Sequence, residues 1–164
     1  MSAKRPPLAA KLKYKLPTLK LALVHESRDH TPLYPLRTPE DAAALLEPLK
    51  HAPEEHFVSL HLNAKHEVIG LHEVSHGTIS SSLVHPREVF KAALLANSYA
   101  ILVCHNHPSG STISPSGEDI ETTNQLLEAG TMLGVHVIDH LIMGPNQDVY
   151  SLRENHPELW KKKP

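Results

Sequence analysis

Cysteine and aromatic residues are scarce in this chain of 164 residues. The single cysteine, Cys104, excludes an intrachain disulfide and a four-cysteine zinc site, and it suits a reducing, cytoplasmic setting. Aromatic residues make up only 4% of the chain, so aliphatic side chains must fill the core. No apolar run reaches the roughly 18 residues of a membrane span, and the N-terminus has no signal-peptide pattern. We therefore expect a cytoplasmic protein that does not contact a membrane.

The net charge is also small. It is −2 with histidines neutral, which argues against a general nucleic-acid-binding surface. Basic residues gather at the two ends instead, because the six charged residues of 1–20 are all lysine or arginine and residues 161–163 are all lysine. We expect a flexible basic arm over residues 1–16, one domain over 17–153, and a basic C-terminal tail over 154–164.

Local patterns predict a sheet flanked by helices. Apolar or alternating runs predict strands at 19–25, 57–62, 67–74, 100–104, 135–143 and 149–152. Capping residues, with proline or acids in the first turn, predict helices that begin after Thr38, at Pro86 and after Ser116. Residues 26–37 are expected to form a loop, and the chain after 152 is expected to be frayed.

Two histidines follow the apolar run Ala100–Cys104. Residues i and i+2 of an extended chain point the same way, so His105 and His107 can face one point beyond the strand end. Asp119 follows in the first turn of the next helix, where a capping pattern with Ser116 would orient both side chains. Three such ligands leave the fourth position of a tetrahedral zinc ion open for water, as in catalytic sites. The spacing therefore predicts a zinc site.

The motif His105-Asn106-His107-Pro108-Ser109-Gly110, followed by Pro115, Ser116 and Asp119, resembles the signature of RadC-like proteins of the JAB/MPN metalloprotease superfamily. Similar stretches at 73–78, 84–93, 129–130 and 139–140 extend the resemblance over roughly residues 17–153. The resemblance implies a cytidine-deaminase-like α/β fold with a mixed sheet flanked by helices. It also implies one zinc ion per chain, held by the three ligands named above.

Two further roles follow from the same resemblance. Ser116 matches a serine that helps to stabilise the tetrahedral intermediate, and Glu55 matches a glutamate general base that precedes the first strand of the core hairpin. Glu54 and Glu73 are the competing choices for the base. The implied function is a zinc-dependent hydrolase, of the metalloprotease or isopeptidase type, that attacks a peptide or protein substrate with a metal-activated water.

The sequence departs from the family pattern in two respects. The pattern usually places ten residues between the second histidine and the aspartate, whereas Pro108 to Glu118 makes eleven, so strict spacing favours Glu118 as the ligand. We favour Asp119, because a loop tolerates an insertion more readily than a helix turn does. RadC-like proteins also usually begin with a helical region similar to DNA-binding domains, for which this chain has no room, so we do not expect direct DNA binding.

Other functions stay open at this point. The fold would also suit a non-catalytic module or a DNA-repair accessory, and the basic arm favours the latter. A zinc deaminase is excluded, because its Pro-Cys-X-X-Cys motif needs two cysteines. Cys104 is expected to be inert packing. His140 is interpreted first as packing and second as a residue behind the metal ligands.

Overall fold

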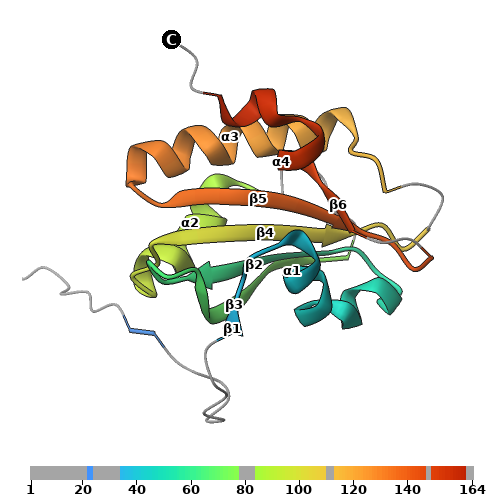
Figure 1. Cartoon of the computed structure of the whole chain (residues 1–164), viewed down its shortest axis with the longest axis horizontal. Helices are drawn as coiled ribbons and strands as arrows, with labels where there is room; N and C mark the ends of the chain where they lie inside the picture. Colours follow the sequence, from blue (N-terminus) through green and yellow to red (C-terminus); the bar gives the residue numbers. More distant parts are fainter. Residues whose placement is uncertain (1–21, 24–33, 78–83, 110–112, 147–148, 162–164) are drawn as a thin grey trace, which may run out of the picture.

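The computed structural model describes residues 22–23, 34–77, 84–109, 113–146 and 149–161 (Figure 1). The arm expected over residues 1–16 lies outside this part of the chain. So does the strand expected over 19–25, apart from Ala22 and Leu23, which belong to neither a helix nor a strand.

The described residues form a mixed sheet of six strands. In spatial order these are β1 (Tyr34–Pro35), β3 (Glu67–His76), β2 (His56–Leu62), β4 (Ala100–Asn106), β5 (His136–Met143) and β6 (Val149–Ser151). β4 and β5 run parallel, and the other neighbouring pairs are antiparallel. The expected α/β fold with a mixed sheet is confirmed, and the strands expected from residue 57 onward are present with small shifts at their ends.

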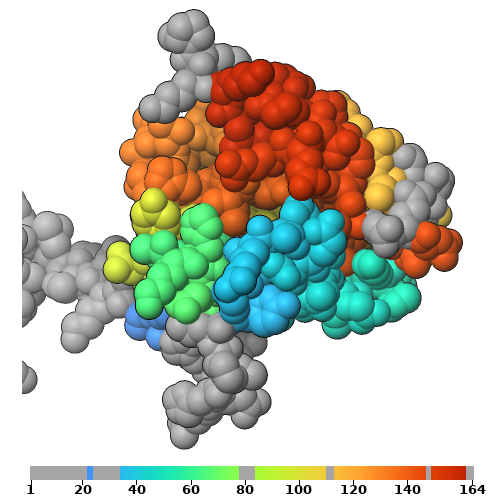
Figure 2. Space-filling model, in the orientation of Figure 1, coloured from blue at the N-terminus to red at the C-terminus, as the bar shows by residue number. Residues whose placement is uncertain are grey.

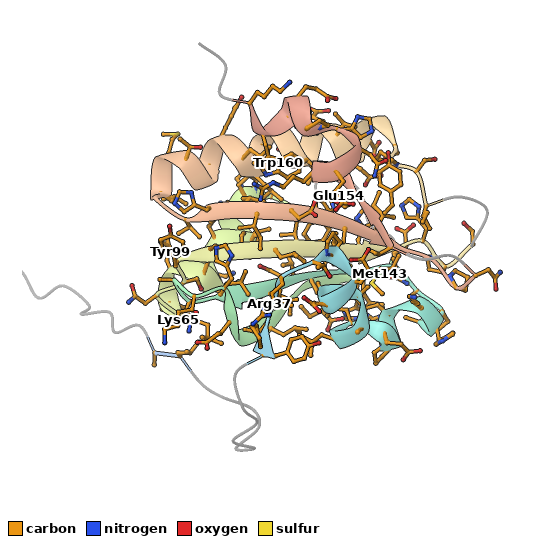
Figure 3. All side chains as sticks on the ribbon, in the orientation of Figure 1. Arg37, Lys65, Tyr99, Met143, Glu154 and Trp160 are labelled. Atoms are coloured by element: carbon orange, nitrogen blue, oxygen red, sulfur yellow. The ribbon has the colours of Figure 1, made fainter. Side chains whose placement is uncertain are left out.

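Helices cover both faces of this sheet (Figure 1). They are α1 (Pro39–Leu45), the 3-10 helix η2 (Glu47–His51), α2 (Pro86–Leu95), α3 (Gly117–Leu133), α4 (Leu152–Asn155) and the 3-10 helix η3 (Pro157–Trp160). Within the described ranges, none of these helices has the length and apolar character needed to cross a bilayer. α3 connects the parallel strands β4 and β5, so the carboxyl ends of both strands lie at one edge, which Met143 marks in Figure 3.

Two apolar cores lie on opposite faces of the sheet. Ile101 and Val103 of β4 pack with α2 and α3, whereas Leu102 and Cys104 pack with α1 on the other face. β4 is therefore buried on both faces, which explains why its sequence is a continuous apolar run. Cys104 is fully buried, as expected for inert packing, and burial raises the pKa of its thiol.

Local hydrogen bonds begin the helices where the sequence predicts. The Thr38 hydroxyl accepts from the N–H of Asp41 at 3.3 Å, and Ser116 begins α3 in the same way. α3 ends at Gly134, whose φ of 70° is left-handed and favours glycine. Gly130 permits a close approach to β5, because a Cβ there would lie 2.5 Å from the carbonyl oxygen of Val135.

The expectation that the chain after residue 152 is frayed is wrong as far as residue 160, because α4 and η3 are formed there. Arg153 donates to the carbonyl of Ile138 at 2.9 Å, and Trp160 Nε1 donates to the carbonyl of Val137 at 2.9 Å. Figure 3 labels Trp160. Both carbonyls belong to the part of β5 that β6 does not pair. The red C-terminal segment is accordingly part of one continuous surface with its neighbours in Figure 2.

The loop expected over residues 26–37 contains a short strand that the sequence did not predict. β1 pairs with β3 through Tyr34 and Val68 and lies at the edge of the sheet. Proline usually weakens a strand prediction because it has no N–H to donate. Pro35 is tolerated because an edge strand has only one hydrogen-bonded neighbour.

Candidate metal centre

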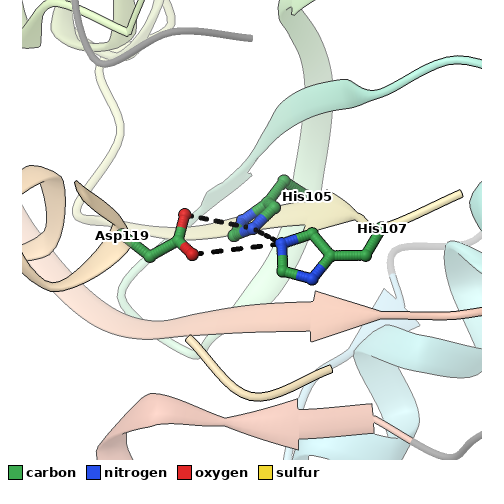
Figure 4. A group of neighbouring side chains, drawn as sticks. All are labelled: His105, His107 and Asp119. Atoms are coloured by element: carbon green, nitrogen blue, oxygen red, sulfur yellow. Dashed lines mark hydrogen bonds and ion pairs between the residues drawn. The ribbon is translucent and has the colours of Figure 1, made fainter. Parts of the chain in front are cut away.

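His105, His107 and Asp119 meet at the carboxyl end of β4 (Figure 4). Their ligand atoms all lie within 4.8 Å of one another. His105 Nε2 is 2.9 Å from His107 Nε2 and 3.2 Å from Asp119 Oδ1, and His107 Nε2 is 3.9 Å from Asp119 Oδ2. The structure thus brings together the three residues that the sequence selected as candidate ligands.

The two histidines face the same point because the extended chain continues past the end of β4. His105 lies within the strand, and His107 lies just beyond it. The N–H of His107 donates to the carbonyl of Met143 at 2.8 Å, which extends the pairing with β5. The two imidazole centroids are 4.8 Å apart, as the i, i+2 spacing predicts.

The carboxylate of Asp119 reaches the histidines because its capping hydrogen bonds fix the orientation of the side chain. Its Oδ2 accepts from the Ser116 N–H and from the Ser116 hydroxyl, each at 2.7 Å, while Oδ1 faces His105. Glu118, which strict family spacing favours, lines the same pocket but is not in the cluster of ligand atoms. One residue along a helix turns a side chain by about 100°, so the two acids cannot occupy the same position.

The hydroxyl of Ser116 both donates and accepts a hydrogen bond. It donates to Asp119 Oδ2 at 2.7 Å and accepts from the Asp119 N–H at 3.1 Å. Its expected role at an oxyanion would therefore require the O–H to rotate away from the carboxylate. That role stays a prediction.

Glu55 lines a pocket of about 220 Å³ together with the cluster. The other lining residues are Phe57, Val84, His105, His107, Ser116, Glu118, Asp119 and Thr122. Glu73 does not line this pocket, and its carboxylate contacts His56 Nδ1 at 2.5 Å with nearly half of the side chain exposed. The pairing of Phe57 with His105 explains the position of Glu55, because the chain before β2 then runs beside the chain after His105.

Asn106 is a residue of the site whose part the sequence did not reveal. Its Nδ2 donates to the carbonyl of Glu54 at 2.9 Å, and its Oδ1 accepts from the N–H of His56 at 2.7 Å. The amide thus bonds to the backbone on both sides of Glu55. Its position between the two histidines was the only available signal, because the partner segment lies about 50 residues away.

His140 contacts one candidate ligand, His105, on the side away from the cluster. Its Nε2 lies 2.8 Å from His105 Nδ1, and its Nδ1 lies 2.7 Å from the hydroxyl of Thr123. The sequence allowed two interpretations of His140, and this contact fits the second, a residue behind the metal ligands. A bulge in the β4–β5 register between Ile101 and Leu102 places His140 opposite Val103, on the same face as His105.

Burial keeps the inner imidazoles neutral. Removal from water lowers the pKa of His105 to about 4, with the charge of Asp119 opposing this shift and that of His107 adding to it. Burial also lowers the pKa of His140 well below its ordinary value, and His105 and His107 add to the effect. Both residues are therefore uncharged at pH 7, the form in which an imidazole nitrogen binds a metal.

The geometry of these donors fits a zinc ion. Nitrogen and oxygen ligands about 2.0–2.2 Å from a tetrahedral zinc lie roughly 3.4 Å from one another. His105 Nε2 lies 2.9 Å from His107 Nε2 and 3.2 Å from Asp119 Oδ1, both close to that value. His107 Nε2 lies 3.9 Å from the other carboxylate oxygen, Oδ2, so Asp119 has an oxygen near each histidine. With small side-chain shifts, His105, His107 and Asp119 could therefore hold zinc at the pocket that all three residues line.

Comparison with known proteins agrees with the fold. Residues 36–157 match the RadC-like JAB domain family. Similar curated proteins include a UPF0758 protein of Alkaliphilus metalliredigens, 48% identical over 122 residues, and one of Staphylococcus haemolyticus, 44% identical over 134 residues. The fold is that of a JAB/MPN-type domain. The chain belongs to the RadC-like JAB domain family.

The relatives are longer than this chain. The two alignments cover 74% and 81% of this chain but 52% and 58% of the relatives, so the chain spans about half the length of the curated proteins that it matches. Their names specify no reaction. The function is therefore inferred from the chemistry of the site.

Proposed function

We propose that this protein is a zinc-dependent hydrolase that cleaves an amide or isopeptide bond in a peptide or protein. One observation carries the proposal: His105, His107 and Asp119 converge on a pocket that Glu55 also lines. A structural zinc site is usually closed by four protein ligands. The described residues offer three, which leaves a position for water beside a carboxylate.

The residues divide the chemistry between them. When bound, zinc supplies a Lewis acid that lowers the pKa of a water molecule to about 7. Glu55 accepts the proton of the attacking water and passes it to the leaving nitrogen. Ser116 holds Asp119 in its ligand orientation, and after rotation of its O–H it donates to the developing oxyanion. Buried, neutral His105 offers its Nε2 to the ion.

The proposed substrate class rests on the resemblance to JAB/MPN metalloproteases. Direct binding of DNA is not part of the proposal, because the net charge is −2. We assign the reaction to the cytoplasm. The only cysteine is a buried free thiol, the state that a reducing compartment maintains.

Metal analysis combined with a turnover assay tests the proposal. Protein purified without chelators should carry about one zinc per chain, and His107→Ala should lose most of it, because two protein ligands rarely suffice. Peptide-amide and isopeptide-linked substrates should be cleaved by the wild-type protein and not by Glu55→Gln. Absence of zinc would refute the proposal. Zinc without cleavage of any such substrate would instead identify a non-catalytic module with this fold, the alternative that the sequence leaves open.

A further inference from the structure

Three hydrogen bonds, two of them buried and one partly buried, connect His105 to the backbone of Asp119 through residues that do not line the pocket. The Thr123 hydroxyl lies 2.6 Å from the carbonyl oxygen of Asp119 and 2.7 Å from His140 Nδ1, and His140 Nε2 lies 2.8 Å from His105 Nδ1. Thr123 and His140 are fully buried, and His105 is 4% exposed. Solvent therefore does not compete for the two bonds that His140 makes.

The donor and acceptor of each hydrogen bond in this series follow from the bond to the Asp119 carbonyl. A carbonyl oxygen only accepts, so the single proton of the Thr123 hydroxyl points to Asp119. The hydroxyl oxygen must then accept from His140 Nδ1–H. A neutral imidazole has one N–H, so His140 Nε2 is an acceptor and His105 Nδ1–H donates to it. His105 is left with its lone pair on Nε2, which faces the cluster.

The other protonation states of His140 cannot form the same series of hydrogen bonds. If His140 carried its proton on Nε2, its Nδ1 would face a hydroxyl oxygen whose proton is already used, and two acceptors would meet. If His140 were charged, a cation would be buried between His105 and Thr123, both uncharged partners. The ring of Phe57 packs against both imidazoles, parallel to His105 and edge-on to His140, and gives neither a hydrogen-bond partner.

The result at the pocket is an arrangement that suits a cation, or an N–H donor such as His107 Nε2, which lies 2.9 Å from His105 Nε2. The lone pair of His105 Nε2 faces the carboxylate oxygen Asp119 Oδ1 at 3.2 Å. Two acceptors at this distance repel each other, and a cation bound by both removes that repulsion. His140 and Thr123 join the same two residues behind the pocket. This series of hydrogen bonds therefore sets the orientation of His105 and its distance from Asp119.

We infer that His140 and Thr123 are positioning residues that hold His105 in the Nδ1–H tautomer, with Nε2 ready to bind the metal. The inference rests on the proposed metal site and deepens it. Partners of this kind raise the affinity for a metal by fixing the tautomer and the ring orientation of the ligand. The chain of bonds ends on the backbone of α3, which also carries Asp119.

The test uses the full chain with zinc alone. Thr123→Val replaces the hydroxyl by a methyl of similar size and should weaken zinc binding roughly 10- to 100-fold in a chelator competition. Thr123→Ser keeps the oxygen and should bind zinc nearly as wild type does. Thr131→Val is the matched control, because Thr131 makes the same hydroxyl-to-carbonyl bond in α3, to Leu127 at 2.8 Å, on an exposed surface. Its zinc affinity should not change.

A second measurement reads the tautomers directly. Two-bond proton–nitrogen spectra of the metal-free protein should show His105 and His140 both protonated on Nδ1, and Thr123→Val should abolish that pattern for His140. An Nε2–H tautomer at wild-type His140, or wild-type zinc affinity in a folded Thr123→Val protein, would overturn the inference. Neither readout needs a substrate. A protein that shows these tautomers and zinc affinities but hydrolyses nothing would refute the proposed hydrolase and leave the inference standing.

Discussion

Asn106 holds the backbone on both sides of Glu55. Its amide donates to the carbonyl before Glu55 and accepts from the N–H after it, so the polypeptide around the proposed base is bonded to the strand that carries two proposed ligands. Asn106 is 1% exposed, and both functions of its amide are used. The position of Glu55 relative to His105 and His107 is therefore set by one side chain between the two histidines.

Replacement of Asn106 should separate hydrolysis from metal binding. Asn106→Ala removes both bonds, so Glu55 should shift while the ligands stay in place. We expect zinc content to be retained and hydrolysis to fall by roughly 10- to 100-fold, the cost of misplacing a catalytic group by about 1 Å. Asn63→Ala is the control, because its amide makes comparable bonds in the β2–β3 turn. Equal loss of activity in both variants would show that general destabilisation is responsible.

Glu55→Gln should keep zinc and the fold but lose hydrolysis. The amide cannot accept a proton, and removal of a general base costs roughly 10²-fold or more. Glu73→Gln should remain active, because Glu73 contacts His56 and does not line the pocket. Rates measured under single-turnover conditions, alongside zinc content, check this prediction. Loss of activity in Glu73→Gln alone would reassign the base.

Asp119→Ala should strip zinc from the protein, whereas Glu118→Ala should leave it bound. The physical reason is the rotation set by the capping bonds, which turn Asp119 Oδ1 toward His105. Elemental analysis of the two variants, purified side by side without chelators, decides between them. The reverse result would mean that the family spacing, and not the capping relation, selects the ligand.

The stability of the metal-free protein should fall between pH 6.5 and pH 4, in part because of His61. Burial lowers the pKa of His61 from 6.5 to about 4, and His72 adds to the shift. Unfolded His61 takes up a proton below pH 6.5 but folded His61 does so only near pH 4, so acid favours the unfolded chain. The protonation of His61 alone should lower the free energy of unfolding by about 2 kcal/mol between pH 7 and pH 5.

Urea unfolding at several pH values measures this loss. His61→Leu should have a shallower dependence on pH than the wild type, although its stability at pH 7 also loses the bond to Ser98. An identical slope in His61→Leu and wild type would contradict the assignment.

Much of the local structure was predictable because its causes are close together in the sequence. The apolar run of β4 indicates burial on both faces, and the capping residues Thr38 and Ser116 indicate where helices begin. The adjacency of His105 and His107 follows from the two-residue repeat of an extended chain. The C-terminal helical turns were missed because they depend on Trp160 and Arg153 bonding to β5, more than ten residues away.

The sequence by itself determined the ligand-type residues and their local spacing, because short-range geometry and capping bonds act within one strand end and one helix turn. Only the tertiary structure decided what surrounds them. Pairing of β2 with β4 brings Glu55, and not Glu73, to the pocket. A single bulge in the β4–β5 register turns His140 toward His105. Val137 packs against α2 and α3, on the same face of the sheet. Without the bulge, alternation from Val137 would have placed Asp139 on that face instead of His140. Side chains alternate between the faces of a sheet, so one inserted residue reverses every assignment beyond it.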